Sequence, residues 1–256
     1  DDCNGQGSMA SCDYCDMGEN YDLTGTVIEA TSPVAVFSGH DCTFVPYNYW
    51  ACDHLEEQMM PLETWGKDFI VGRTAPQNAT GYNPEPNVIR VVSGADGNTI
   101  SFNPAHPVLG SSITLDQGEW QEFEVTENYH VTSNPGAIMI GQFLVGQNMY
   151  SDLTNNPEYH GDPAYSLMVP TEQYRNQYTF LAPSSMTYNF VTITKRVIEG
   201  SAPVYLDGNP VAESEFTTAV GGTEWGVANV PITGTHHTVE STQPFGIVVY
   251  GFASYT

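Results

Sequence analysis

The sequence has little positive charge. Lys and Arg together number 6 against 30 Asp and Glu, so the formal net charge is −24 at pH 7. A surface this acidic repels phosphate backbones and anionic lipids, so we expect no nucleic acid among the partners. The acidity fits a salty or cation-rich medium, where salt screens the self-repulsion of the chain. A need for solubility alone explains the charge equally well.

Long apolar runs are also missing. No stretch approaches the roughly 20 apolar residues that a membrane helix needs, so we expect no membrane insertion. No signal peptide is recognisable, and the sequence begins with Asp rather than Met. These features predict a mature or excised fragment of a secreted protein.

Catalytic motifs are absent as well. The sequence contains no Gly-x-Ser-x-Gly, no His-Glu-x-x-His and no Gly-rich phosphate loop. These motifs place a nucleophile, a zinc ion or a nucleotide in many hydrolases and kinases. We therefore predict that the protein is not an enzyme.

Helical patterns are scarce. No window of a dozen residues carries a convincing helical stripe, although a short helix could form at "DHLEEQMM" (Asp53–Met60), before Pro61. The chain has 24 Gly, 17 Pro, 15 Tyr and 11 Phe. This composition is typical of many short strands joined by tight turns.

An internal repeat organises the chain. The matching segments are Met60–Val71 with Val169–Phe180, Asn87–Val92 with Asn189–Thr194, "EWQEFEV" from Glu119 with "EWGVANV" from Glu224, and His130–Phe143 with His237–Phe252. The four matches keep the same order, at offsets between 102 and 109. Self-similarity of this kind indicates repeated structural units.

We therefore predict an all-β fold with two tandem units, residues 55–150 and 151–256. A unit of about 100 residues with six or seven strands suits a β-sandwich. β-Propeller-like blades are the alternative, but their usual period is about 40–50 residues. Leu23–Gly39 resembles Ile232–Gly251, so residues 20–54 are predicted to hold the closing hairpin of an incomplete unit and a disulfide loop. Residues 1–19 form a Cys-rich acidic segment.

Recurrent aromatic residues have two interpretations. Trp65 and Tyr174 occupy equivalent positions, as do Trp120 and Trp225. Such residues could stack on sugars, but recurrence in a duplicated fold favours core packing. The turns "GADGNT" and "LDGNP" are typical of β-hairpins.

Several segments together resemble a known family. "DLTGT", "PVAVFSGH", "ACDHLEEQMMPLETWGKDFIV", "GDPAYSLMVPTEQYRNQYTFLAP" and "PFGIVVYGF" occur in this order. This succession resembles the IgGFc-binding protein N-terminal domain family, over about residues 21–256. The bacterial secreted members look closest, through "CDYCDMGENYDLTGT" and "GDPAYSL". The resemblance implies an extracellular, non-catalytic, β-rich module of surface or matrix proteins, and it carries Fc binding onto no named residue.

The five cysteines are clustered in the first fifth of the chain. Clustered Cys in a Lys-poor chain indicate an oxidising compartment, and the odd number leaves one thiol without a partner in this chain. We predict a disulfide between Cys42 and Cys52. His40 and His54 flank this pair, so a tetrahedral zinc site is the alternative, although the nine-residue gap is long for paired zinc ligands.

The N-terminal segment offers weaker candidates. We expect Cys3 to be joined to Cys12 or Cys15 as a cross-linked strap, with a Cys12-x-x-Cys15 redox or metal pair as the alternative. Calcium is a possible cofactor, and no other cofactor is expected. The weak calcium ligands are Asp13, Asp16 and Glu19, which lack the regular EF-hand spacing.

Three further positions attract attention. Asn78 begins a glycosylation sequon. Glu63 and Glu172 recur in register, but in separate sandwiches they should lie farther apart than the roughly 10 Å that paired glycosidase acids allow. His236 and His237 fall in a polar hairpin and are predicted to be exposed.

Two classes of function remain open. The first is a secreted or cell-surface adhesion module that binds a protein or glycoprotein surface. The second is a structural subunit of an extracellular filament, tube or coat that self-assembles by strand pairing between copies. An exposed strand edge would favour the second class, because it recruits strands from neighbouring molecules.

Overall fold

The fold is described from a computed structural model. It describes residues 22–47, 49, 52–75, 86–149, 161–217 and 220–253, together with the backbone of 8–9 and 12–13. Its strands are β1 (Ser8–Met9), β2 (Cys12–Asp13), β3 (Val36–Phe44), β4 (Cys52–Met59), β5 (Asp68–Val71), β6 (Asn87–Ser93), β7 (Asn98–His106), β8 (Gly110–Leu115), β9 (Trp120–Val125), β10 (Tyr129–Asn134), β11 (Ile138–Leu144), β12 (Ala164–Leu167), β13 (Arg175–Leu181), β14 (Tyr188–Arg196), β15 (Tyr205–Leu206), β16 (Asn209–Pro210), β17 (Trp225–Ile232) and β18 (His236–Phe252). Its 3-10 turns are η2 (Leu62–Thr64), η3 (Thr171–Gln173), η4 (Glu213–Glu215) and η5 (Val220–Gly222).

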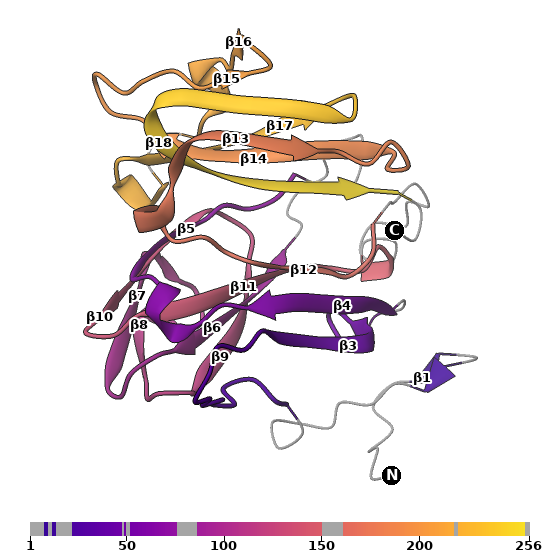
Figure 1. Ribbon diagram of the computed structural model, residues 1–256, viewed down its shortest axis with the longest axis vertical. Helices are drawn as coiled ribbons and strands as arrows, with labels where there is room; N and C mark the ends of the chain where they lie inside the picture. Colours follow the sequence, from indigo (N-terminus) through magenta and orange to yellow (C-terminus); the bar gives the residue numbers. More distant parts are fainter. Residues whose placement is uncertain are drawn as a thin grey trace.

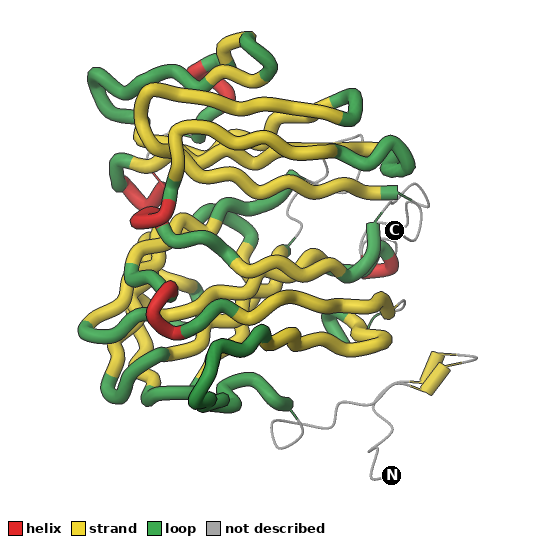
Figure 2. Tube along the Cα trace, viewed as in Figure 1, coloured by secondary structure: helices red, strands yellow, loops and turns green. Residues whose placement is uncertain are grey.

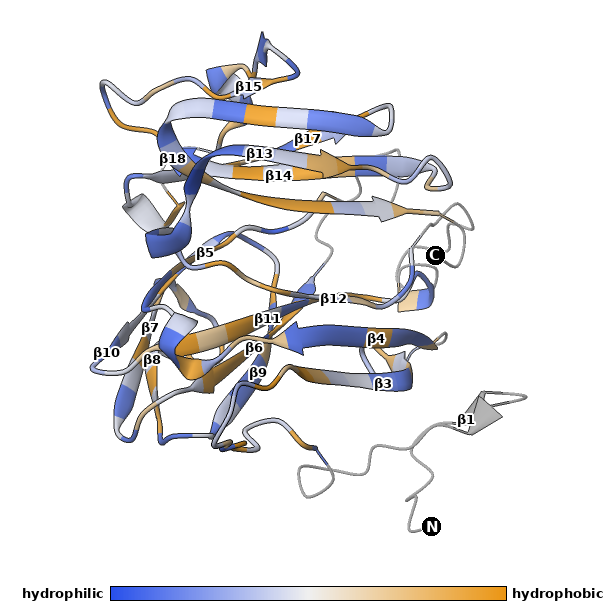
Figure 3. Cartoon of the chain, in the orientation of Figure 1, coloured by the Kyte–Doolittle hydropathy of each residue, from blue (hydrophilic) through white to orange (hydrophobic). Residues whose placement is uncertain are grey.

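The described chain is all-β, as predicted, and its helical pieces are single short turns (Figure 1, Figure 2). The short helix expected at Asp53–Met60 is wrong, because β4 occupies this segment. Glu56 is exposed while Leu55 is buried, and Figure 3 shows the mostly hydrophilic character of β4. Pairing with β3 overrides the local helical preference of the two glutamates.

The first unit is a sandwich of two four-stranded sheets. One sheet has the order β5-β10-β7-β8, and the other has the order β12-β11-β6-β9. Along β6 the side chains alternate: Ile89 and Val91 are fully buried between the sheets, whereas Arg90 lies on the outer face. The buried core is formed by Phe69, Val71, Ile89, Val91, Ile100, Phe102, Leu115, Phe123, Val125, Tyr129, Val131, Ile138, Ile140 and Met168.

In the second unit, one long strand crosses between both sheets. The first part of β18 pairs with β13 and β15, and its last part pairs with β14, which in turn pairs with β17. β18 thus takes the places that β10 and β11 share in the first unit. Its core is formed by Ala182, Val191, Ile193, Val204, Val211, Phe216, Ala228, Ile232, Val239 and Phe245.

The two units repeat one strand order. The sequence β5-β10-β7-β8 corresponds to β13-β18-β15-β16, and β11-β6-β9 corresponds to β18-β14-β17. Each unit opens with a Pro followed by a single 3-10 turn: Pro61 (φ −64°, ψ 148°) precedes η2, and Pro170 (φ −68°, ψ 154°) precedes η3. The tandem sandwich-like repeat predicted from the sequence is therefore confirmed.

The two predicted hairpin turns differ in outcome. Leu206–Pro210 joins β15 to β16, and both Asp207 (φ 51°) and Gly208 (φ 76°) have the positive φ that a tight two-residue hairpin requires. Gly94–Thr99 instead connects β6 in one sheet with β7 in the other. The prediction of a hairpin there is wrong, because the turn crosses between the layers of the sandwich.

β3 and β4 form a two-stranded sheet beside the first sandwich (Figure 1). β4 leads into Pro61 and η2 as β12 leads into Pro170 and η3. β4 pairs with β3, and β12 pairs with β11. β3 therefore holds the position of a closing strand, as the incomplete first repeat predicts. Residues 23–35 contain no strand, so the hairpin forms one strand later than Leu23–Gly39 suggested.

This pairing crosses the repeat boundaries. By sequence, β12 belongs to the second unit, but its hydrogen bonds go to β11 of the first. The division at residues 150 and 151 therefore separates two paired strands. That the segments given by these boundaries fold as separate domains stays a prediction.

Arg90 fastens the N-terminal segment to the outer face of the first sandwich. Its Nη1 donates to Asp22 Oδ2 at 2.8 Å and to Thr24 Oγ1 at 2.7 Å, and its Nη2 donates to Glu122 Oε2 at 2.7 Å. The guanidinium lies 4.3 Å from the ring centre of Trp120. Burial raises the pKa of Asp22, but the hydrogen bonds from Thr24 and the charge of Arg90 bring this pKa below its usual value.

A second polar network joins the two sandwiches. Ala75 N donates to Tyr250 Oη at 2.7 Å, and Asn229 Nδ2 donates to Arg73 O at 3.0 Å. Next to it lies an apolar cluster that draws on both units, formed by Ile70, Val220, Trp225 and Val227. The outer face of the second sandwich is thus covered by the first unit.

The recurrent aromatics are unequally buried. Trp225 is 8% exposed and belongs to the cluster between the units, so its core assignment is confirmed. Trp65, Trp120 and Tyr174 are half-buried. Trp120 lies under Arg90 on an outer sheet face, so placing it in the core is wrong: its strand turns this side chain away from the sandwich interior.

We expect Trp225→Ala to lower the free energy of unfolding by about 3–5 kcal/mol, because it empties a buried site between the units. Trp120→Ala should cost less, about 1–2 kcal/mol, because it removes a half-buried ring and its cation–π contact. Chemical denaturation of both variants measures the difference. Equal losses, or an unchanged Trp225→Ala protein, would contradict this assignment.

Candidate functional site

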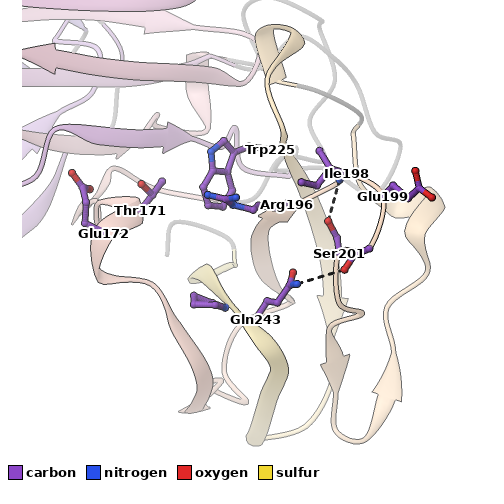
Figure 4. Close-up of a pocket in the computed structure, with 10 residues that line it drawn as sticks. Thr171, Glu172, Arg196, Ile198, Glu199, Ser201, Trp225 and Gln243 are labelled. Atoms are coloured by element: carbon purple, nitrogen blue, oxygen red, sulfur yellow. Dashed lines mark hydrogen bonds between the residues drawn. The ribbon is translucent and has the colours of Figure 1, made fainter.

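A groove of about 470 Å³ opens between η3 and the bend of β18 (Figure 4). Its walls come from η3, the end of β14, the loop at 198–201, the start of β17 and the bend of β18. The lining residues are Thr171, Glu172, Arg196, Ile198, Glu199, Gly200, Ser201, Trp225, Gln243 and Pro244. Loops held by a β-scaffold are the usual place for binding residues.

Arg196 and Trp225 lie together on the wall formed by β14 and β17. The guanidinium of Arg196 lies 5.3 Å from the ring centre of Trp225, and its Nη2 lies 3.0 Å from Glu224 Oε1. Trp225 is therefore covered by a cation and by its neighbours in the core. A sugar cannot stack on this ring without displacing Arg196, which argues against the sugar-platform interpretation.

The loop at 198–201 is braced from two sides. Ile198 N donates to Ser201 Oγ at 3.0 Å, and Ala202 N donates to Gln243 Oε1 at 3.1 Å. Gln243 Nε2 reaches Gly200 O at 3.5 Å, as the dashed lines in Figure 4 show. The bend of β18 therefore fixes the shape of this wall.

A buried lysine anchors the strand behind the groove. Lys195 is 3% exposed, and its Nζ donates to Glu213 Oε1 at 2.6 Å and to Ala202 O at 3.2 Å. It also lies 4.8 Å from the ring centre of Phe216. Both charged partners are satisfied, so Lys195 is a structural tether for η4 and for the loop.

The groove is more acidic than basic. Glu172 and Glu199 line it, and Glu224 pairs with Arg196. Glu172 Oε1 also accepts a hydrogen bond from Lys67 N at 3.0 Å. A neutral polar or cationic group of a partner would therefore be favoured here over an anionic one.

Glu63 and Glu172 lie on turns that touch each other. Gln173 Nε2 donates to Thr64 O at 2.5 Å, which joins η3 to η2. The expectation that separate sandwiches hold these turns far apart is wrong, because the second unit starts at the flank of the first. Glu172 is engaged by the backbone of Lys67, which gives it a structural role.

Cys42 and Cys52 are joined as a disulfide, with their Cα atoms 5.0 Å apart. This bond links β3 to β4. His40 Nδ1 accepts from Cys42 N at 3.1 Å, and His54 Nε2 lies 3.4 Å from Glu56 Oε2. The disulfide uses the two thiolates that the alternative zinc site would need.

The remaining N-terminal candidates fall largely outside the described residues. Cys3, Cys15, Asp16, Glu19 and Asn78 all lie there. The backbones of Cys12 and Asp13 belong to β2, where they pair with Met9 and Ser8. Among the described residues, no group of three or more His, Cys, Asp or Glu is arranged to hold a metal ion.

His237 is buried, contrary to the sequence prediction. It is 3% exposed, and its Nδ1 lies 2.8 Å from Asp207 Oδ2. Thr238 N donates to Asp207 Oδ1 at 2.9 Å, and this bond, together with His237, lowers the pKa of Asp207. The prediction failed because β18 turns His237 inward, against Phe180, while His236 stays exposed.

Asp162 is a buried acid that the sequence did not reveal. It is 9% exposed, and its Oδ1 has no hydrogen-bond partner in the described structure. Burial, followed by the charge of Asp53, raises the pKa of Asp162 to about 6. A buried carboxylate without a partner destabilises the fold at neutral pH.

The geometry defines a tandem β-sandwich protein that presents a loop-walled groove. The family model described as IgGFc binding protein matches residues 6–251, so the chain belongs to that family, as the sequence resemblance indicated. The human IgGFc-binding protein is 29% identical over 243 residues, which cover 93% of this chain and 4% of the human protein. No solved structure matches the chain. None of the helical turns among the described residues has the length and apolarity to cross a membrane.

We expect non-reducing peptide mapping to recover Cys42 linked to Cys52. Replacing both with Ser should lower the free energy of unfolding by about 2–3 kcal/mol, the usual contribution of a bridge that closes a short loop. The parent protein under reductant is the matched control. Two free thiols, or stoichiometric zinc in the purified protein, would contradict the bridge.

Asp162→Asn should stabilise the protein at pH 8 by about 1–2 kcal/mol. The folded-state pKa lies near 6, above the value of 3.8 for the free side chain. The folded protein therefore holds this proton more tightly, and stability is lost as the pH rises through 6. At pH 4 the variant and the parent should differ little. Urea denaturation at both pH values tests this, and an equal effect at the two values would refute the ionisation argument.

Proposed function

We propose that the chain is an extracellular, non-catalytic binding module that adheres to a protein or glycoprotein surface. The observation that carries this proposal is the family match over residues 6–251. The human relative is named for binding the Fc part of immunoglobulin G. A disulfide between β3 and β4 is consistent with a secreted or cell-surface location.

The groove is the proposed contact surface. Its walls are loops held by the second sandwich, and its carboxylates outnumber its one cation, Arg196. With a net charge of −24, the module favours partners that present Lys or Arg, and salt should weaken their association. Calcium as an additional cofactor remains a proposal for the N-terminal segment.

Human Fc fragment is the first probe, with Fab as the comparison. We expect saturable binding of Fc in biolayer interferometry, and at least tenfold weaker binding by Glu199→Lys, which reverses an exposed charge in the groove. Glu124→Lys is the control, because Glu124 is exposed on β9 of the other sandwich. Fc binding that is undetectable, or that both variants weaken equally, would reject Fc or the groove respectively.

Assembly into a filament, tube or coat is the second candidate. It is favoured by β3, which pairs on one edge only within the described residues. Electron microscopy of the secreted protein at physiological salt separates the two candidates. Ordered polymers would support assembly, and monodisperse particles would support binding.

A further inference from the structure

β3 has an unpaired edge within the described residues. It pairs with β4, whereas the closing strand β11 of the first unit lies between β12 and β6. In the second unit, the closing part of β18 pairs with β14, the counterpart of β6. The position beside β3 that β6 and β14 fill in the other units is therefore open.

Exposed apolar side chains lead to this edge. Their exposed fractions are 58–80%. They are Leu23, Val27, Ile28, Val34 and Phe37. Single apolar residues on a surface are ordinary, but five in one short segment beside an unpaired strand mark an interaction site.

The two strands that fill this position in the complete units define its chemistry. β6 has the sequence "NVIRVVS" and β14 has "YNFVTITKR". Both combine β-branched residues with cations. Arg90, Lys195 and Arg196 are three of the six Lys and Arg in the chain. A closing strand of this repeat is therefore matched to an extended partner that carries basic residues.

Charge around the open edge points the same way. Asp41 on β3, Glu56 on β4 and the nearby Glu29 are exposed, and the whole chain carries −24. This field attracts a basic strand and repels a second copy of the chain. A second copy also has no free strand of the required kind, because its β6 and β14 are each paired on both edges.

We propose that the open edge of β3 receives an extended segment of another protein, in which β-branched or aliphatic residues accompany Lys or Arg. The added strand would hydrogen-bond to β3 and cover Phe37, in the mode of β-strand addition. This inference rests on the proposed function as a protein-binding module, and it names a second contact surface apart from the groove.

A synthetic peptide with the β14 sequence "YNFVTITKR" is the probe, added to the whole chain. Hydrogen exchange read by mass spectrometry should show at least fivefold slower exchange in residues 36–41 with the peptide bound. Phe37→Asp should weaken binding at least tenfold. Val108→Asp is the matched control, because Val108 is 85% exposed in the turn between β7 and β8, and it should bind as the parent does.

Three results would overturn the proposal. The first is unchanged exchange at residues 36–41 at millimolar peptide. The second is equal binding of a peptide in which Glu replaces its Lys and Arg. The third is concentration-dependent dimerisation in sedimentation that Phe37→Asp abolishes, which would make a second copy the occupant. Val34→Asp replaces Phe37→Asp if the latter fails to melt cooperatively. Peptide binding without Fc binding would reject Fc and leave the edge proposal standing.

Discussion

Strand pairing across the repeat boundary is the constraint on which this structure depends. The strand that opens a unit does not join the sheets of its own unit. β4 pairs with β3 and β12 pairs with β11, in each case the closing strand before it. The proline and the 3-10 turn that follow then redirect the chain into the next sandwich. The units are thus joined by backbone hydrogen bonds as well as by side-chain contacts.

This arrangement explains how the outer sheet faces are covered. The first unit covers the outer face of the second, through Arg73 and Ala75 with Asn229 and Tyr250. The segment around Asp22 covers the outer face of the first, through Arg90. It also explains the contact between η2 and η3, because the second unit starts where the first unit's opening turn lies. The groove beside η3 is a product of the same junction.

The sequence was informative where the repeat was informative. Four matches in constant order predicted the two sandwiches, and the similarity of Leu23–Gly39 to Ile232–Gly251 predicted the extra closing strand. Sequence similarity could not show that an opening strand pairs backwards, so Asp53–Met60 looked helical. The inward rotation of His237 depends on the course of β18, which no local pattern specifies. The loop at 198–201 is set by Gln243, more than 40 residues away, and so the groove could not be located from the sequence.

Charge connects the two proposed surfaces. The cations Arg90, Lys195 and Arg196 are each engaged by carboxylates within the chain: Asp22 and Glu122, Glu213, and Glu224 respectively. Internal pairing therefore consumes scarce positive charge and leaves most of the 30 acids facing solvent. A partner that binds the groove or the edge of β3 must supply its own cations, and salt should screen both contacts. The closing strands show that the fold already uses this solution internally, because the strand beside each complete one is basic.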